Sequence, residues 1–99
     1  MTMDPILVVD DDDALRQSLV SALESLPVEI TEAATGRQAL ELLEQRRFAV
    51  VVTDLVMRDV DGFAVLDTAR RTHAPCKVVM LTGHGSRDVA VQAMERGAT

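Results

Sequence analysis

The sequence predicts an α/β fold in which an open parallel sheet carries helices on both faces. The first observation is that short apolar runs alternate along the chain with segments of helical periodicity. Successive strand–helix–strand units cross over in the right-handed sense, so this alternation builds a parallel sheet. The second observation is that two nearly unbroken apolar runs, residues 6–9 and 49–54, both lead into aspartates. Such runs are typical of strands buried on both faces, which places these two strands in the centre of the sheet.

Helix and strand signals divide the N-terminal half of the chain after the first strand. A helix is predicted to begin at residue 12 or 13 and to continue to about residue 26, where Pro27 stops it. Its apolar stripe, with spacings of three and four, consists of Leu15, Leu19, Leu23 and Leu26. Residues 28–33 alternate apolar and polar side chains, which indicates an edge strand with one wetter face. Thr35 and Gln38 match a capping box and open a second helix that runs to about residue 46.

The C-terminal half repeats the same alternation of helix and strand. Asp61 can cap a third helix over residues 62–72, which follows the central strand after a loop. A fourth apolar strand is predicted at residues 77–81, and a glycine-containing turn follows it at residues 82–85. A fourth helix is predicted over residues 86–96, with a serine at its cap position.

The order of the strands follows from which of them are expected to be buried. The strand at residues 28–33 belongs at an edge, whereas the strands that lead into Asp10 and Asp54 must be neighbours if their carboxylates meet. The order 2-1-3-4 satisfies both conditions and puts the reversal between strands one and three. Ligands of open α/β sheets bind at that reversal, outside the carboxyl ends of the strands. We therefore expect Asp10, Asp11 and Asp54 to share one rim, with capping of helix N-termini as the simpler alternative role.

The composition is that of one small globular domain, and we treat residues 1–99 as a single domain. A net charge of −6 disfavours direct contact with nucleic acid or with an anionic membrane. No run approaches the ~20 apolar residues of a membrane span, and the first residues lack the features of a signal peptide. The single cysteine, Cys76, excludes an internal disulfide and fits the reducing cytoplasm, where we expect the protein to be located.

Three carboxylates on one rim repel each other, so at least one pKa should be raised unless a cation binds. Mg²⁺ suits such a site, because it binds one or two carboxylates, keeps several waters and accepts phosphate oxygens. The backbone carbonyl of Val56, two residues after Asp54, can supply a further oxygen ligand. A carboxylate beside Mg²⁺ is also a candidate nucleophile toward phosphorus, which would give an aspartyl phosphate. Thr82 can donate a hydrogen bond to a phosphoryl oxygen, and an ordinary strand-end turn is the alternative there.

Together these elements resemble the receiver domain of bacterial two-component response regulators over the whole chain. The resemblance rests on Ile-Leu-Val-Val-Asp-Asp-Asp at residues 6–12 and on Asp54 after Val-Val-Val-Thr. It also rests on the pair Asp61 and Gly62 and on Val-Val-Met-Leu-Thr-Gly-His at residues 78–84. These motifs occur in the order and spacing of the family. The resemblance implies a flavodoxin-like receiver fold and a phosphorylation switch of a two-component system rather than an enzyme.

The family resemblance also implies a role for each candidate site residue. Asp54 would accept a phosphoryl group from a phosphohistidine on a sensor histidine kinase. Asp10 and Asp11 would hold Mg²⁺ together with Asp54 and the Val56 carbonyl, with Asp11 as the favoured direct ligand. Thr82 would move toward the phosphoryl group and carry the switch. The residues after the fourth strand most resemble receivers of enhancer-binding activators, which implies control of transcription.

Two departures from the family pattern stand out. The family usually has Met-Pro-Gly after the acceptor, where this chain has Met57, Arg58 and Asp59, so we expect a less rigid loop. Receivers also continue into a fifth strand, a phosphate-binding lysine and a fifth helix, so we expect a domain that is incomplete at its C-terminus. Lys77 starts its strand about 13 Å from the active rim and cannot replace that lysine. We expect the uncovered edge of strand 77–81 to lead to a homodimer, to exchange of elements between two copies, or to lower stability than that of a longer chain.

Two other functions stay open at this point. One is a pseudo-receiver that keeps the fold as an interaction module and takes no phosphate. The other is a phosphohydrolase with an aspartate nucleophile at Asp10, but the chain lacks room for a substrate pocket. The remaining polar residues have simpler interpretations, with Arg16 and Arg37 expected on the surface and Cys76 as a small apolar side chain.

Overall fold

The computed structural model describes residues 4–72 and 76–81. Its elements are β1 (Asp4–Val9), α1 (Asp13–Leu23), β2 (Val28–Ala33), α2 (Gly36–Gln45), β3 (Val50–Asp54), α3 (Gly62–Thr72) and β4 (Lys77–Leu81). The predicted alternation of strand and helix is therefore confirmed over these residues. The predicted turn and helix from residue 82 onward, Thr82 included, lie outside the described residues. No helix in the described part of the chain is long and apolar enough to cross a membrane.

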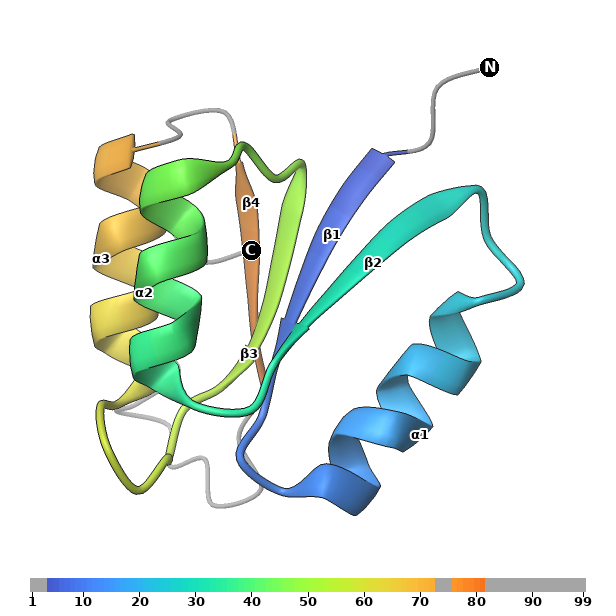
Figure 1. The fold of residues 1–99 in the computed structure, drawn as a ribbon, viewed down its shortest axis with the longest axis horizontal. Coiled ribbons are helices and arrows are strands. Elements are labelled where there is room, and N and C mark those ends of the chain that lie inside the picture. The colour runs from blue at the N-terminus through green and yellow to red at the C-terminus, as the bar shows by residue number, and fades with distance from the viewer. Residues whose placement is uncertain (1–3, 73–75, 82–99) are drawn as a thin grey trace.

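The four strands form one parallel sheet in the order β2-β1-β3-β4, as predicted (Figure 1). β1 pairs with β2 on one side and with β3 on the other, and Val9 lies opposite Thr53. Figure 1 shows α2 and α3 side by side on one face of the sheet and α1 on the opposite face. The reversal of strand order thus falls between β1 and β3, where both strands lead into aspartates.

The hydrophobic core lies between the sheet and the pair formed by α2 and α3. Fully buried side chains in this core include Leu7, Val9, Leu43, Val51, Val65, Leu66 and Val78. On β3 the side chains of Val51 and Thr53 are fully buried, whereas Val50 and Val52 are only half-buried. The prediction that this strand is buried on both faces is therefore correct for one face only. The physical reason is that α1, the described helix on the other face, packs mainly against β1 and β2.

The described helices begin where the sequence placed their caps. The side chains of Asp12, Thr35 and Asp61 each accept a hydrogen bond from the backbone N–H three residues later. Each bond satisfies one of the free N–H groups in the first helical turn. α1 nevertheless ends at Leu23, earlier than predicted. The proline after Leu26 disfavours helical backbone at that leucine, so the helix ends before it.

The leucine stripe of α1 is less buried than an apolar stripe that faces a core would be. Leu15 and Leu26 are 56% and 50% exposed, and Leu19 and Leu23 are only half-buried. The buried residue of α1 is instead Arg16, which the sequence analysis placed on the surface. A charged side chain tolerates burial only when its donors are matched by acceptors. The acceptors of Arg16 are Asp10 directly after β1, Glu32 on β2 and Asp13 on α1, and they lie near the candidate site.

Candidate functional site

The carboxyl ends of β1 and β3 bring three carboxylates together. One oxygen from each of Asp10, Asp11 and Asp54 lies within 4.8 Å of the others. Asp10 is buried, and the other two side chains are half-buried. The cause is the register of the sheet, because Val9 lies opposite Thr53 and the next residues of both strands therefore meet. The structure thus places the three predicted residues at one site, while the roles assigned to them stay predictions.

Asp10 is the innermost of the three acids, with 3% of its surface exposed. Its Oδ1 accepts a hydrogen bond of 2.9 Å from the backbone N–H of Asp12. Burial is the main cause that raises the pKa of the Asp10 carboxyl; the hydrogen bond acts against it, and the charges of Asp54 and Asp11 raise it further. The sequence predicted a raised pKa from repulsion between the acids. The larger cause is that Asp10 directly follows the buried end of β1.

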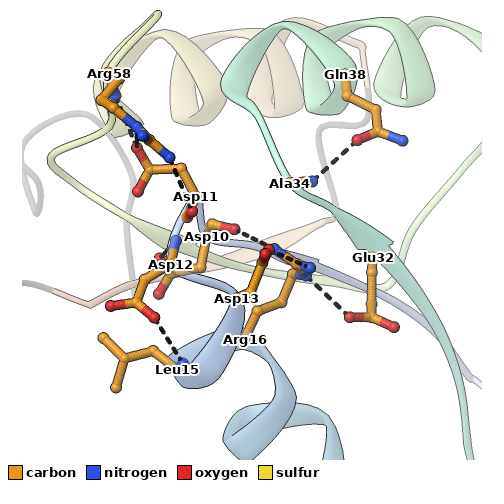
Figure 2. Close-up of polar contacts among 10 residues, drawn as sticks. All are labelled: Asp10, Asp11, Asp12, Asp13, Leu15, Arg16, Glu32, Ala34, Gln38 and Arg58. Atoms are coloured by element: carbon orange, nitrogen blue, oxygen red, sulfur yellow. Dashed lines mark hydrogen bonds and ion pairs between the residues drawn. The ribbon is translucent and has the colours of Figure 1, made fainter.

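Asp11 makes its contacts with the loop after β3. Its Oδ2 accepts hydrogen bonds from the backbone N–H and the Nε of Arg58, at 3.0 and 3.2 Å. Figure 2 shows the Arg58 side chain extending from its loop to Asp11. Nothing in the sequence placed the Arg58 side chain against the acids. The structure adds it to the candidate site.

Arg16 forms hydrogen bonds and ion pairs around the point where the chain leaves β1. Its Nη1 donates to the backbone carbonyl of Asp10 at 2.9 Å, and its Nε donates to Glu32 at 3.0 Å (Figure 2). Its Nη2 forms an ion pair of 2.7 Å with Asp13. The contact with Asp13 is the main cause that raises the pKa of Arg16; burial acts against it, and the contact with Glu32 raises the pKa further. Arg16 therefore joins β1, β2 and α1 at the point where Asp10 leaves the sheet, and its spacing of three from Asp13 was the available signal.

Asp59 fixes the same loop to the start of α2. Its Oδ1 accepts a hydrogen bond from the backbone N–H of Gly36 at 3.0 Å, and its Oδ2 accepts one from Arg37 at 2.8 Å. The hydrogen bond from Arg37 is the main cause that lowers the pKa of the Asp59 carboxyl. The sequence suggested that Arg58 and Asp59 make the loop less rigid. In the structure both charged residues contact distant parts of the chain, Arg58 at Asp11 and Asp59 at the start of α2, while the lower rigidity stays a prediction.

The carboxylate of Asp54 is more open than those of its neighbours. Within the described residues it accepts no hydrogen bond, although its strand is fixed on both sides. Asp54 pairs with Leu81 of β4. Thr82 is the next residue in the sequence, and it lies outside the described residues. Lys77 pairs with Val50 at the other end of β3, in agreement with the prediction that it is remote from the site. The Val56 side chain is 62% exposed.

The donor set of the cluster fits a hard divalent cation. Carboxylate oxygens are the ligands that Mg²⁺ prefers, and it needs only one or two of them beside its waters. Oδ2 of Asp10, Oδ1 of Asp11 and both carboxylate oxygens of Asp54 accept no hydrogen bond from the described residues. These oxygens are thus available to a metal ion. The three negative charges also favour a cation over water alone.

Comparison with known proteins gives a consistent result. A family model described as the response regulator receiver domain matches residues 6–99. The chain is 38% identical over 93 residues to the transcriptional regulatory protein SrrA of Staphylococcus aureus. This match covers 94% of the chain and 38% of the relative, so the chain spans well under half the length of that curated relative.

Solved structures resemble the chain over nearly its whole length. A CheY-like response regulator receiver domain protein from Methanospirillum hungatei JF-1 superposes with a TM-score of 0.90 and 31% identity, over 97% of this chain and 77% of that one. A response regulator protein from Burkholderia pseudomallei superposes with a TM-score of 0.89 and 26% identity, over 96% of this chain and 56% of that one. The latter structure contains a phosphorylated aspartic acid, a calcium ion and citrate.

Proposed function

Because the chain belongs to the response regulator receiver domain family, we propose that it accepts a phosphoryl group on Asp54 from a phosphohistidine of a sensor histidine kinase. The observation that carries the proposal is the convergence of Asp10, Asp11 and Asp54 at the carboxyl ends of β1 and β3. An aspartate that meets two further acids at the end of a central strand can act as a nucleophile only if their charge is balanced. In the proposed site a bound cation would balance this charge.

Phosphoryl transfer depends mainly on positioning and on charge neutralisation. A carboxylate oxygen of Asp54 forms a bond to phosphorus while the P–N bond of the phosphohistidine breaks, and the imidazole leaves with a proton from water. β3 positions the nucleophile, because it pairs with β1 and β4 on both sides. The carboxylate of Asp54 has no hydrogen-bond partner in the described part of the chain, so no contact there must break before attack.

We assign the metal-binding role to Asp10, Asp11, Asp54 and the backbone carbonyl of Val56. When bound, Mg²⁺ supplies positive charge to the phosphoryl oxygens and screens the acids from each other. Asp10 contributes a carboxylate that the buried end of β1 and the Asp12 N–H hold in one position. Asp11 is half-buried at the rim and offers its Oδ1, which accepts no hydrogen bond from residues 4–72 and 76–81.

As a signalling domain, the chain is proposed to relay its phosphorylation state to a transcriptional output. The basis is that SrrA, at 38% identity, is named a transcriptional regulatory protein. Thr82 is the proposed hydroxyl that contacts the phosphoryl group, because it follows the residue that pairs with Asp54. The sensor kinase is the proposed macromolecular partner, and the homodimer stays a prediction.

The test is phosphorylation of the purified chain by a small phosphoryl donor such as acetyl phosphate, with Mg²⁺, followed by intact-mass analysis. We expect the wild type to gain the mass of one phosphoryl group and Asp54→Asn to gain none. Asp4→Asn is the matched control, because Asp4 is an exposed acid at the opposite end of β1 and should leave labelling unchanged. Removal of Mg²⁺ by a chelator should abolish the label.

The outcomes distinguish the alternatives. Equal labelling of wild type and Asp54→Asn would contradict the assignment of the acceptor. A wild type that binds Mg²⁺ in calorimetry but takes no label would instead indicate an interaction module with a metal site. Continuous release of phosphate from an added phosphomonoester would indicate a phosphohydrolase.

A further inference from the structure

Arg58 brings a positive charge to the acidic cluster from the loop after β3. Its backbone N–H and Nε donate to the same oxygen of Asp11, Oδ2, at 3.0 and 3.2 Å. Its Nη2 lies 3.4 Å from the backbone carbonyl oxygen of Asp11 (Figure 2). The Asp11 side chain is 17% exposed and that of Arg58 is 86% exposed. In this ion pair the Asp11 carboxylate is therefore largely buried, whereas the Arg58 side chain is open to solvent.

In the described part of the chain, Arg58 is the basic residue that forms an ion pair with a cluster acid. Arg16 is also near, but its guanidinium contacts the backbone carbonyl of Asp10 and the carboxylates of Asp13 and Glu32. It therefore neutralises none of the three cluster carboxylates directly. A proline at this position would lack both the backbone N–H and the side-chain cation that make the contact with Asp11.

We propose that Arg58 is a resident cation of the acidic site, which competes with a divalent cation for Asp11 and so sets the metal concentration at which the site fills. The inference rests on the proposed function, since it assumes that Asp10, Asp11 and Asp54 bind Mg²⁺. Without metal, the guanidinium balances part of the negative charge at the rim. When a divalent cation binds, it must either draw Asp11 away from Arg58 or share that carboxylate with a like charge. Both routes lower the affinity of the site.

The exchange can occur without unfolding of the loop. The Arg58 side chain is mostly exposed, so its guanidinium can move into solvent at little cost in burial. The neighbouring Asp59 keeps its two hydrogen bonds to the backbone of Gly36 and Arg37 at the start of α2. The loop therefore stays attached while Arg58 is released. Arg58 acts as a movable counterion on a fixed loop.

The size of the effect follows from ordinary electrostatics. An exposed ion pair, together with the repulsion between a guanidinium and a divalent cation in a mostly aqueous medium, corresponds to about a two- to tenfold change in affinity. We therefore expect Arg58→Gln, which keeps most of the side chain but removes its charge, to bind Mg²⁺ about two- to tenfold more tightly than the wild type. Isothermal titration calorimetry measures this on the unphosphorylated chain.

Arg47→Gln is the matched control, since it removes the same charge from an exposed residue that lies after α2 and away from the acids. Its affinity should stay within about twofold of the wild type, as expected for a distant screened charge. Arg58→Lys should fall between the wild type and Arg58→Gln, because it keeps the charge but loses the planar fork. Circular dichroism melts show whether each variant is folded.

Each result decides between the two proposals. If the wild type binds no Mg²⁺, the metal site of the proposed function is wrong and the competition falls with it. If the wild type binds Mg²⁺ and Arg58→Gln binds with the affinity of Arg47→Gln, only the competition is wrong. Weaker binding by Arg58→Gln would also overturn it, since Arg58 would then assist the metal site.

Discussion

Replacement of Gly62 by alanine tests how closely α3 packs against the residue that carries the proposed chemistry. Gly62 is the first residue of α3, and its N–H donates to the carbonyl oxygen of Leu55 at 2.7 Å. A Cβ here would clash with the carbonyl oxygen of Asp54 and would lie 2.8 Å from the Cα of Leu55. Both are backbone atoms, so the clash can be relieved only by moving α3 or the end of β3. The glycine of the Asp-Gly motif is therefore needed for close approach.

The expected cost can be worked from these distances. Carbon atoms in contact are about 3.5–4.0 Å apart, so the new Cβ and the Leu55 Cα must separate by roughly 0.7–1.2 Å. Overpacking of this kind costs about 1–3 kcal/mol, which lowers the melting temperature of a domain of this size by about 4–24 °C. The atoms that the new Cβ would meet belong to Asp54 and Leu55, next to the acids. We therefore also expect weaker Mg²⁺ binding and slower phosphorylation.

Thermal melts and calorimetric Mg²⁺ titrations of Gly62→Ala check both parts of the prediction. Gly36→Ala is the control, because Gly36 is also the first residue of a helix but its Cβ would meet Val60 and the Asp59 carboxylate and not the backbone of Asp54 or Leu55. It should lose stability without loss of metal affinity. If Gly62→Ala melts at the wild-type temperature and binds Mg²⁺ with wild-type affinity, the close approach does not constrain the site and the reasoning is refuted.

Two further predictions concern the surroundings of the acids. Arg16→Met should lower the free energy of unfolding by about 1–3 kcal/mol, because it leaves the Asp10 carbonyl and Glu32 without their donor. Urea unfolding measures this change. Arg37→Met is the control, because Arg37 is exposed and its replacement should change the stability little. An equal loss in both variants would contradict the anchoring role. The raised pKa of Asp10 means that the metal-free folded state holds more protons than the unfolded state between the unfolded value of ~3.9 and the higher folded value. The free energy of unfolding should therefore fall as the pH rises through that window, and Asp10→Asn or added Mg²⁺ should reduce this fall. Urea unfolding at several pH values across the window measures it. Parallel curves for wild type and Asp10→Asn would show that Asp10 is not the group responsible.

The sequence was sufficient for the sheet because its signals are local and agree with each other. Apolar runs, caps such as Thr35 and the aspartates after two strands fix the elements, and right-handed crossovers then limit the topology. The same topology brings Asp54 to Asp10 and Asp11 without further information. The clustering of the site was therefore predictable from the strand order.

What the sequence did not reveal are contacts made by long polar side chains. Arg16 lies on a helix with a leucine stripe, yet it is the residue that is buried, because it finds acceptors directly after β1, on β2 and on α1. Arg58 and Asp59 are charged loop residues, and their partners lie 47 and 22–23 residues away in the chain. Periodicity describes which face of an element is apolar, but it contains no information about such distant pairs. They become visible only when the elements are in place.

The direct pairing of β1 with β3 gives the site an all-or-none character during folding. Val9 faces Thr53 in a parallel ladder, and a slip of one residue would turn every side chain of one strand to the opposite face. In a slipped chain Asp10 and Asp54 would point to different sides, so the cluster would be lost entirely rather than weakened. A cation that binds the cluster therefore stabilises only the native register over the slipped ones, by mass action. The metal would thus select the correct pairing of two strands that are far apart in the sequence, a slow step in the folding of parallel sheets.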